Sequence, residues 1–283
     1  MEEVPALPDD VLDVGRRLIP SPVFLVGCAR SGTSIFGEAL AAHPGVVYLF
    51  EVSALWSAVI PDRQHHRLER SDATREVASS IYRSLANEAE DAGGAAVLVE
   101  KNPKHVLRIA FLDALFPWAR FVQIIRDGRD VVSSLMFRNR GEQWGHLEIP
   151  GWRDLLERYP KDNHIRCACQ WRDAVAVARR EGQALGPRRY LEIRYEDLVR
   201  NPKATVQRAL DFSGLSPDPL VDEFLRKIQD ETAGSYHARR QVRHYIENHS
   251  RRIGRYKENL TEKQAAEVVE VCGDLLRELG YVT

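Results

Sequence analysis

The sequence predicts an α/β fold with three layers, in which a central, mostly parallel β-sheet is flanked by helices. Short apolar runs typical of buried strands alternate with longer segments of helical pattern, and these runs cover residues 23–26, 46–50, 95–99, 121–125 and 190–193. Such alternation indicates parallel strands joined by crossover helices. Helix-start and helix-stop residues stand between the runs, as this interpretation requires.

The first strand, 23–26, leads into a glycine-rich loop and then a helix over 35–42. Gly27 and Gly32 have the spacing of a Walker A loop, but Thr33 stands where that motif has Lys. A turn of this kind gathers backbone N–H groups and a helix N-terminus around an anion, so the sequence predicts an anion site. The cation that reaches the β- and γ-phosphates of a nucleoside triphosphate is missing, and Arg30 offers a cation elsewhere in the loop. An ordinary strand–turn–helix without a ligand is the alternative.

Charged residues follow the next three strands. Glu51 comes directly after the run 46–50, Lys101 lies just beyond 95–99, and Arg126 ends the run 121–125. Ser134 stands two helical turns past Arg126, so the two side chains could converge on one anion. Alternatively, Arg126 pairs with Asp130 at the helix start.

Helix boundaries complete the pattern after the last strand. Asn201 is followed by Pro202 at the first helical position, and residues 261–264 fit a capping box that opens the last helix. Gly280 is expected to end that helix.

The chain is expected to form one domain over residues 1–283, because no repeat and no long linker interrupts it. Three segments break the alternation: 52–94, with at least one extra helix; 137–163, rich in aromatic and charged residues; and 230–258, irregular and basic. Trp144, Trp152 and Trp171 lie in or near the second of these, where aromatic residues could line a pocket, although Trp171 is expected in the core.

Composition excludes several classes of protein. The 40 Lys and Arg residues balance 41 Asp and Glu, which argues against a polycationic nucleic-acid binder. No apolar run approaches the roughly 20 residues of a membrane span, and the acidic first residues lack signal-peptide features, so a cytoplasmic location is expected. The four cysteines show no zinc spacing; reduced structural thiols and no metal are expected.

Together, residues 27–34 and 126–134 resemble the two signature regions of sulfotransferases that use 3′-phosphoadenosine 5′-phosphosulfate (PAPS). Residues 100–103, 115–117, 194–198 and 254–260 resemble further family segments in the same order, over nearly the whole chain. The pattern is closer to the tyrosylprotein and carbohydrate branches than to the cytosolic aryl sulfotransferases. The cytosolic aryl sulfotransferases usually have Lys in the first loop, at the position of Arg30 in this sequence. Tyr256 stands where the family has Trp.

The resemblance implies a P-loop NTPase-like sulfotransferase fold, PAPS as donor and adenosine 3′,5′-bisphosphate (PAP) as product. It also implies these nucleotide-binding residues: Arg30, Ser31, Gly32, Thr33, Ser34, Arg126, Ser134, Tyr195, Arg255 and Lys257. By the same resemblance, Lys101 stabilises the transferring group and Glu51 is the base.

The base remains open between two residues. Glu51 could instead act like a helix N-cap, and His105 is its rival because some relatives use His, although a surface position is expected for His105. Lys104 is expected to be solvated, and His43 is interpreted as a helix-end residue. The tyrosylprotein branch has a catalytic Ser in a region that aligns with neither Ser235 nor Ser250 securely.

The expected function is sulfuryl transfer to a hydroxyl of a small molecule, natural product or glycan, with a bacterial acceptor favoured over a secretory protein. A degenerate P-loop kinase or nucleotidase and a non-catalytic nucleotide-binding scaffold are the alternatives. No nucleic-acid partner is expected. The sequence does not fix the acceptor or the oligomeric state, and a homodimer stays open.

Overall fold

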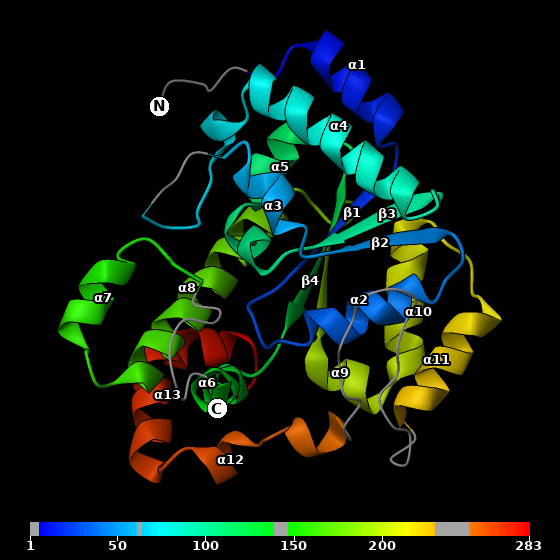
Figure 1. Ribbon diagram of the computed structural model, residues 1–283. Helices are drawn as coiled ribbons and strands as arrows, with labels where there is room; N and C mark the ends of the chain where they lie inside the picture. Colours follow the sequence, from blue (N-terminus) through cyan, green and yellow to red (C-terminus); the bar gives the residue numbers. More distant parts are fainter. Residues whose placement is uncertain (1–5, 61–63, 139–146, 230–248) are drawn as a thin grey trace.

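The computed structural model describes residues 6–60, 64–138, 147–229 and 249–283. Its centre is a five-stranded sheet in the order β2-β3-β1-β4-β5, and every neighbouring pair is parallel (Figure 1). The strands are β1 Pro22–Val26, β2 Val46–Phe50, β3 Val97–Lys101, β4 Arg120–Ile125 and β5 Tyr190–Arg194. Each predicted apolar run is a strand, and the predicted parallel α/β fold is confirmed.

The third strand differs from its prediction, since β3 begins and ends two residues later than the run 95–99. Pairing with both neighbours explains the shift: Val97 lies opposite Val46, while Lys101 lies opposite both Phe50 and Leu25. The ladder therefore extends to Lys101, and the small Ala95 stays outside it. As a result, the charged side chain stands on the last residue of the strand.

Helices and short 3-10 turns connect the strands. Their bounds are α1 Asp9–Leu18, α2 Thr33–Ala41, α3 Ser53–Ser57, η1 Arg70–Asp72, α4 Arg75–Asp91, η2 Pro103–Leu107, α5 Ile109–Leu115, α6 Gly128–Arg138, α7 Trp152–Arg158, α8 Asn163–Ala184, α9 Tyr195–Arg200, α10 Pro202–Ser213, α11 Pro219–Gln229, η3 His249–Arg252, α12 Tyr256–Asn259 and α13 Glu262–Glu278. The extra helix expected in 52–94 is confirmed by α3 and α4.

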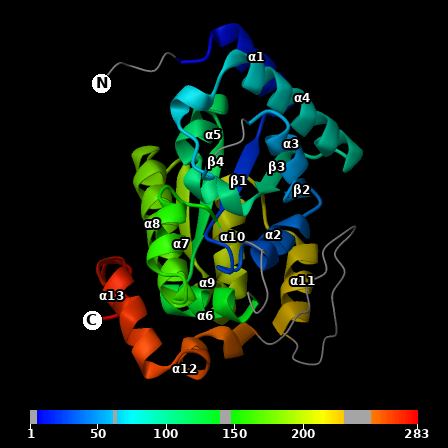
Figure 2. The same cartoon turned by 60° about the vertical axis from the view of Figure 1, so that its left-hand side comes forward.

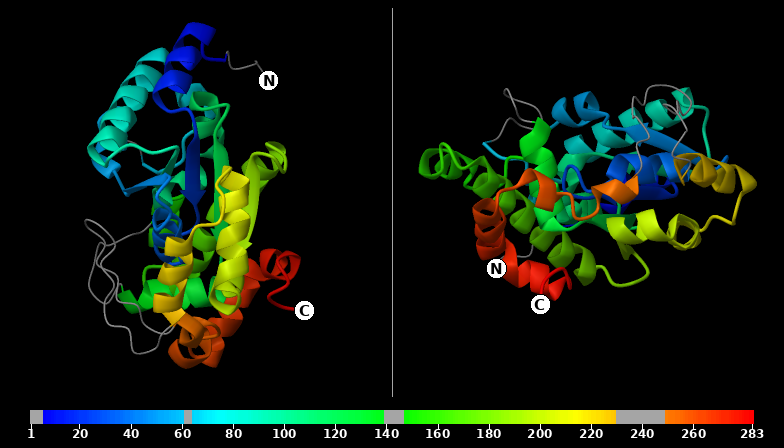
Figure 3. Two further views of the ribbon diagram at one scale, coloured as in Figure 1. Left: turned by 90° about the vertical axis from the view of Figure 1, so that its right-hand side faces the viewer. Right: turned by 90° about the horizontal axis from the view of Figure 1, so that it is seen from below.

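Alternating side chains of the strands supply two separate cores. Phe24 and Val26 of β1 pack under α1, α4, α5 and α8, whereas Val23 and Leu25 pack under α2, α9, α10 and α11. A third cluster joins α6, α8 and α13 and includes Trp171, which is fully buried, as expected. The elements α12 and α13 gather at the end of the molecule opposite α1 and α4 (Figures 2 and 3).

The predicted helix boundaries agree with the structure in most respects. Thr261 and Gln264 form the capping box, with bonds of 3.0 and 3.2 Å, and α13 ends just before Gly280. The helix α10 begins at Pro202, but the Asn201 side chain does not cap it. All four cysteines are free and buried, as expected.

No helix among the described residues is long and apolar enough to cross a membrane.

Candidate active site

The carboxyl ends of all five strands meet at one edge of the sheet, and a predicted site residue lies at or after each end. The loop after β1 carries Arg30, Glu51 follows β2, and Lys101 ends β3, while Arg126 follows β4 and Tyr195 follows β5. Ligands of open α/β sheets bind at this edge. The topology therefore brings together residues that lie up to 165 positions apart.

The loop 27–34 has the backbone of an anion cradle. Gly32 has φ +94°, and a Cβ there would lie 2.4 Å from the Tyr195 ring; a Cβ on Gly27 would lie 2.8 Å from the Ile124 carbonyl oxygen. Glycine is thus required by close approach at both positions. The helix α2 starts at Thr33, so its first N–H groups face the loop without intrahelical acceptors.

Polar side chains of the loop are held in or around the cradle. Ser31 is fully buried, and its hydroxyl has no hydrogen-bond partner among the described residues. Thr33 is buried and Ser34 is half-buried at the start of α2. Arg30 has a positive φ of 73° and donates from Nε to the Ser134 hydroxyl of α6 at 3.0 Å. The two motifs of the sequence are therefore in direct contact.

Arg126 links the loop to the C-terminal segment. Its Nη1 donates to the Arg30 carbonyl at 3.1 Å, and its Nη2 donates to the Arg252 carbonyl at 2.5 Å. Its buried Nε has no hydrogen-bond partner in the described parts of the chain. The alternative pairing with Asp130 is also present, at 3.7 Å. Arg126 therefore makes the structural contact and has one further donor without a partner in the described parts of the chain.

Asp130 anchors the segment that precedes α12. Its carboxylate accepts bonds from the backbone N–H groups of Gly254 at 2.8 Å and Tyr256 at 3.0 Å. Burial raises the pKa of Asp130, although the Arg126 charge opposes this effect. Arg255 lies between these two residues in the sequence and is the N-cap residue of α12. Lys257 is exposed on that helix.

Tyr195 closes the other side of the loop. The guanidinium of Arg126 lies 4.6 Å from the centre of its ring, and its hydroxyl lies 2.8 Å from Nδ1 of His249. Burial raises the pKa of Tyr195. The ring is consequently fixed between Arg126 and Gly32.

Lys101 and Glu51 form an ion pair between neighbouring strands. The Lys101 side chain is 3% exposed, and its Nζ lies 4.5 Å from the centre of the Phe50 ring. Burial lowers the pKa of Lys101, while Glu51 acts in the opposite direction. Glu51 has φ +50° and a side chain that is 39% exposed. The pair thus has a buried cation and a carboxylate within reach of an incoming molecule.

The surface position expected for His105 is wrong, because this residue is fully buried in η2. Its Nε2 lies 2.7 Å from a carboxylate oxygen of Glu100, and its ring meets Trp56 edge to face at 4.6 Å between centroids. The other oxygen of Glu100 accepts a 3.1 Å bond from Trp56 Nε1. The Glu100 carboxylate from β3 and the Trp56 ring from α3 enclose the histidine here.

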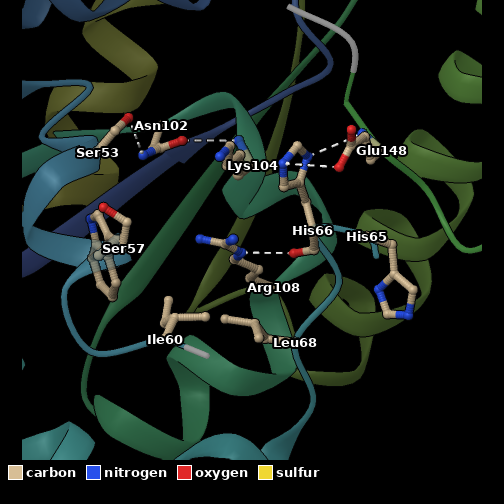
Figure 4. A pocket seen from close by; sticks show the side chains of 11 residues that line it. Ser53, Ser57, Ile60, His65, His66, Leu68, Asn102, Lys104, Arg108 and Glu148 are labelled. Atoms are coloured by element: carbon tan, nitrogen blue, oxygen red, sulfur yellow. Dashed lines mark hydrogen bonds and ion pairs between the residues drawn. The ribbon is translucent and has the colours of Figure 1, made fainter. Parts of the chain in front are cut away.

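A pocket of about 350 Å³ is lined by residues from the segments that follow β2 and β3 (Figure 4). Asn102, the residue after Lys101, and Ser53, two residues after Glu51, line it together with Trp56, Ser57, Ile60, His65, His66, Leu68, Lys104, Arg108 and Glu148. Lys104 therefore lines this pocket and is half-buried. Burial in the wall lowers its pKa.

Sequence reasoning missed Glu38, a buried carboxyl on α2 that is 2% exposed. Burial raises the pKa of Glu38 to about 7, and the charge of Lys101 opposes this shift. The sequence did offer a signal for this burial, because Glu38 is an isolated carboxyl within the otherwise apolar helix that follows the anion loop. His43, by contrast, is the helix-end residue that was expected, since its Nδ1 accepts a 2.9 Å bond from Gly45 N–H.

Some expectations lie outside the described residues, namely those for Ser235 and Trp144. Ser250 lies in η3. Within the described residues no group of three or more His, Cys, Asp or Glu side chains could hold a metal ion.

Proteins of known function resemble this chain in sequence. Protein-tyrosine sulfotransferase A of Caenorhabditis elegans is 27% identical over 210 residues, covering 70% of this chain and 51% of that protein. The chain spans about half the length of the protein-tyrosine sulfotransferases it matches.

Solved structures show the same fold. The sulfotransferase domain of the Synechococcus PCC 7002 olefin synthase superposes with a TM-score of 0.56 at 17% identity, over 91% of this chain and 95% of that one. A mouse sulfotransferase complexed with PAP gives a TM-score of 0.53 at 15% identity, over 95% of this chain and 89% of that one. Residues 22–219 match the model of the sulfotransferase family. The chain therefore belongs to the sulfotransferase family.

Proposed function

We propose that this protein transfers the sulfuryl group of PAPS to a hydroxyl of a small molecule, natural product or glycan. The observation that carries the proposal is the convergence of Arg30, Lys101 and Arg126 at one sheet edge, with the Glu51 carboxylate paired to Lys101. Cations around a glycine-rich loop can bind a nucleotide that carries two anionic groups, and the carboxylate can act as the proton acceptor.

The polar atoms left without partners fit such a nucleotide. The buried Ser31 hydroxyl and Arg126 Nε have no hydrogen-bond partners among the described residues, and buried polar atoms are normally paired. In this proposal the loop 27–34 and the first turn of α2 hold the 5′-phosphosulfate. Arg126 and Ser134 hold the 3′-phosphate, with Arg255 and Lys257 beside them. The Tyr195 ring, fixed against Gly32, contacts the adenine.

Glu51 and Lys101 share the work at the reacting centre. PAPS supplies a sulfur–oxygen bond to phosphate, which breaks as the acceptor oxygen forms its own bond to sulfur. Glu51 accepts the proton of the acceptor hydroxyl, and Lys101 stabilises negative charge on the departing phosphate oxygen. Positioning and electrostatics then account for most of the acceleration, as in phosphoryl transfer.

His105 is assigned a positioning role in place of the base. Its ring is enclosed by Trp56 and Glu100, so it holds the wall of the pocket. This choice favours Glu51, whose side chain is more than one-third exposed.

The binding test is calorimetry with PAP, without magnesium. Tight binding is expected, and no binding would overturn the proposal. The turnover test uses labelled PAPS with phenols, sugars and a tyrosyl peptide as acceptors. Magnesium-dependent ATP turnover would indicate a kinase or nucleotidase instead, although Thr33 in the Lys position argues against that activity. PAPS binding with no transfer to any acceptor would favour a scaffold.

A further inference from the structure

A buried carboxylate links the two strand ends that carry Arg126 and Tyr195. Glu196 directly follows Tyr195 at the start of α9 and is 7% exposed. Its Oε1 accepts a 3.0 Å hydrogen bond from the backbone N–H of Asp127, the residue after Arg126. The segments that follow β4 and β5 are therefore joined one residue beyond each proposed nucleotide contact.

The peptide group between Arg126 and Asp127 is fixed at both of its polar atoms. Its N–H donates to Glu196, and its carbonyl oxygen accepts a 3.2 Å hydrogen bond from Nε1 of Trp171 on α8. Both partners are side chains that come from other elements. Because a rotation of this peptide group would turn the Arg126 side chain with it, Glu196 helps to aim the Arg126 guanidinium.

Tyr281 provides the second hydrogen bond to Glu196. Its hydroxyl donates to Oε2 at 2.9 Å, so each oxygen of the carboxylate has its own donor. Burial raises the pKa of Tyr281, and the hydroxyl therefore keeps its proton at neutral pH. Burial also raises the pKa of Glu196, whereas the hydrogen bonds from Asp127 and Tyr281 oppose that rise. The Tyr281 hydroxyl thus helps to hold a carboxylate in a buried position.

Tyr281 is itself held by residues of the same two segments. Arg129 on α6 donates from Nη2 to the Tyr281 carbonyl at 2.9 Å, and the same nitrogen lies 2.7 Å from the Asp127 carboxylate. The guanidinium of Arg194, the last residue of β5, lies 5.0 Å from the centre of the Tyr281 ring. Three parts of the chain that are distant in sequence therefore meet at this one side chain.

We infer that Tyr281 is a positioning residue for nucleotide binding, which acts through Glu196 on Arg126 and Tyr195. The inference rests on the proposed function, in which these two residues contact the 3′-phosphate and the adenine. With the hydroxyl present, the two segments are ordered before the nucleotide binds. Without it, nucleotide binding must supply part of that order, and the affinity falls.

The test removes the hydroxyl alone. Tyr281→Phe keeps the ring and its contact with Arg194. Calorimetry should show a PAP affinity about 3- to 10-fold lower than that of the wild type, the range expected for one hydrogen bond. Unchanged PAP affinity in this variant would overturn the inference.

Transfer from labelled PAPS gives a second measurement, with an acceptor identified in the turnover test. The KM for PAPS should rise in Tyr281→Phe by a factor similar to the loss of PAP affinity. The kcat should not fall, because Glu51 and Lys101 stand at the ends of other strands. A lower kcat with an unchanged KM would contradict a role in nucleotide binding.

Tyr82→Phe is the matched control. Tyr82 on α4 is fully buried, and its hydroxyl donates to the Leu115 carbonyl in the core. Removal of this bond should lower the thermal unfolding temperature and leave PAP affinity at the wild-type value. An equal loss of PAP affinity in both variants would show that Tyr281→Phe acts only through general stability.

A double-mutant cycle tests whether Tyr281 acts through Glu196. Glu196→Met removes the acceptor of both hydrogen bonds, so it should lower PAP affinity at least as much as Tyr281→Phe does. In that background, Tyr281→Phe should change PAP affinity less than twofold, because residues of one hydrogen-bond network are not additive. Additive effects would contradict a path through Glu196.

Amide hydrogen exchange on the nucleotide-free chain tests the same path without the Glu196 variant. Residues 126–131 should exchange faster in Tyr281→Phe than in the wild type or in Tyr82→Phe, because the segment after β4 has lost part of its support. Equal exchange in all three proteins would contradict the positioning role.

The wild type, measured beside the variants, separates the two proposals. If the wild type binds PAP and Tyr281→Phe binds it equally well, this inference fails and the sulfotransferase proposal stands. If the wild type does not bind PAP, the sulfotransferase proposal fails, and the nucleotide contacts on which this inference rests fail with it.

Discussion

Lys101, the last residue of β3, forms an ion pair with Glu51, the residue that follows β2. The parallel pairing of the two strands produces this contact, because Phe50 lies opposite Lys101 and the chain continues from there to Glu51. The Glu51 N–H also donates to the Lys101 carbonyl at 2.8 Å. Backbone and side-chain contacts thus fix the proposed base against the proposed charge-stabilising group.

Replacing Glu51 should slow transfer strongly while largely sparing nucleotide binding. Glu51→Gln removes the proton acceptor and should lower kcat by about 10²- to 10⁴-fold, the usual contribution of a general base. PAP affinity should change less than tenfold. The measurement is initial-rate transfer from labelled PAPS alongside calorimetry.

The control for this pair is Glu157→Gln, which neutralises an exposed carboxylate on α7. Its transfer rate should equal that of the wild type. If Glu51→Gln retained the wild-type kcat, the assignment of Glu51 as base would be wrong, and His105 would have to be tested with Asn in its place.

Arg126 should contribute to both nucleotide affinity and the position of the C-terminal segment. Arg126→Met removes the bonds to the Arg30 and Arg252 carbonyls as well as the unpartnered Nε. Charge-assisted hydrogen bonds contribute about 1.5–3 kcal/mol, so PAP affinity should fall about 10- to 100-fold or more. Arg126→Lys keeps the charge and loses the fork geometry, and it should restore only part of the affinity. Wild-type affinity in Arg126→Met would exclude a nucleotide contact.

The positions of the main site residues could be predicted because carboxyl ends of parallel strands share one edge. Glu51, Lys101 and Arg126 each follow an apolar run, and this placement suffices to bring them to that edge. The contact between Glu51 and Lys101 could not be predicted, because it depends on β2 lying beside β3. Strand order follows from packing between segments distant in sequence, which local patterns do not contain.

The burial of individual polar residues could not be predicted from the sequence either. His105 was expected at the surface because it falls in a predicted helix, where a histidine is usually exposed, but Glu100 and Trp56 come from two other elements and enclose it. The position of Lys104 in the pocket wall and the burial of Glu38 likewise depend on elements that are distant in sequence. Whether a charged residue is buried depends on partners supplied by the tertiary fold.

Gly32→Ala should destroy nucleotide binding and destabilise the fold. The residue has φ +94°, and its new Cβ would lie 2.4 Å from the Tyr195 ring, so the loop or the ring must move. Gly93→Ala provides a matched comparison, since Gly93 has φ +106° and open space around it. Both variants carry the backbone strain, of the order of 1–3 kcal/mol.

The difference in stability between these two glycine variants reports the effect of the clash with the Tyr195 ring, because both variants carry the backbone strain. Chemical denaturation should show Gly32→Ala to be the less stable of the two, and calorimetry should show PAP binding by Gly93→Ala alone. Normal PAP binding by Gly32→Ala would mean that close packing of Tyr195 on the loop is not needed for the nucleotide site.

Glu38 should make the stability of the protein depend on pH. Burial raises its pKa from the ordinary 4.5 to about 7 in the folded protein. Between these two values the folded state holds a proton that the unfolded state has lost, so the free energy of unfolding falls as pH rises from about 4.5 to about 7. The shift corresponds to about 3 kcal/mol at pH 8.

Glu38→Gln removes this titration and keeps the shape of the side chain. Its free energy of unfolding should match the wild type near pH 4.5 and exceed it by about 3 kcal/mol at pH 8, as measured by denaturation at several pH values. His66, whose pKa is lowered to about 4, contributes the opposite slope below pH 6.5 and is common to both proteins, so it cancels in the difference. Because Lys101 lowers the pKa of Glu38, the Lys101→Met background should move the midpoint of the difference curve to higher pH. A flat difference curve would show that Glu38 does not titrate in this range.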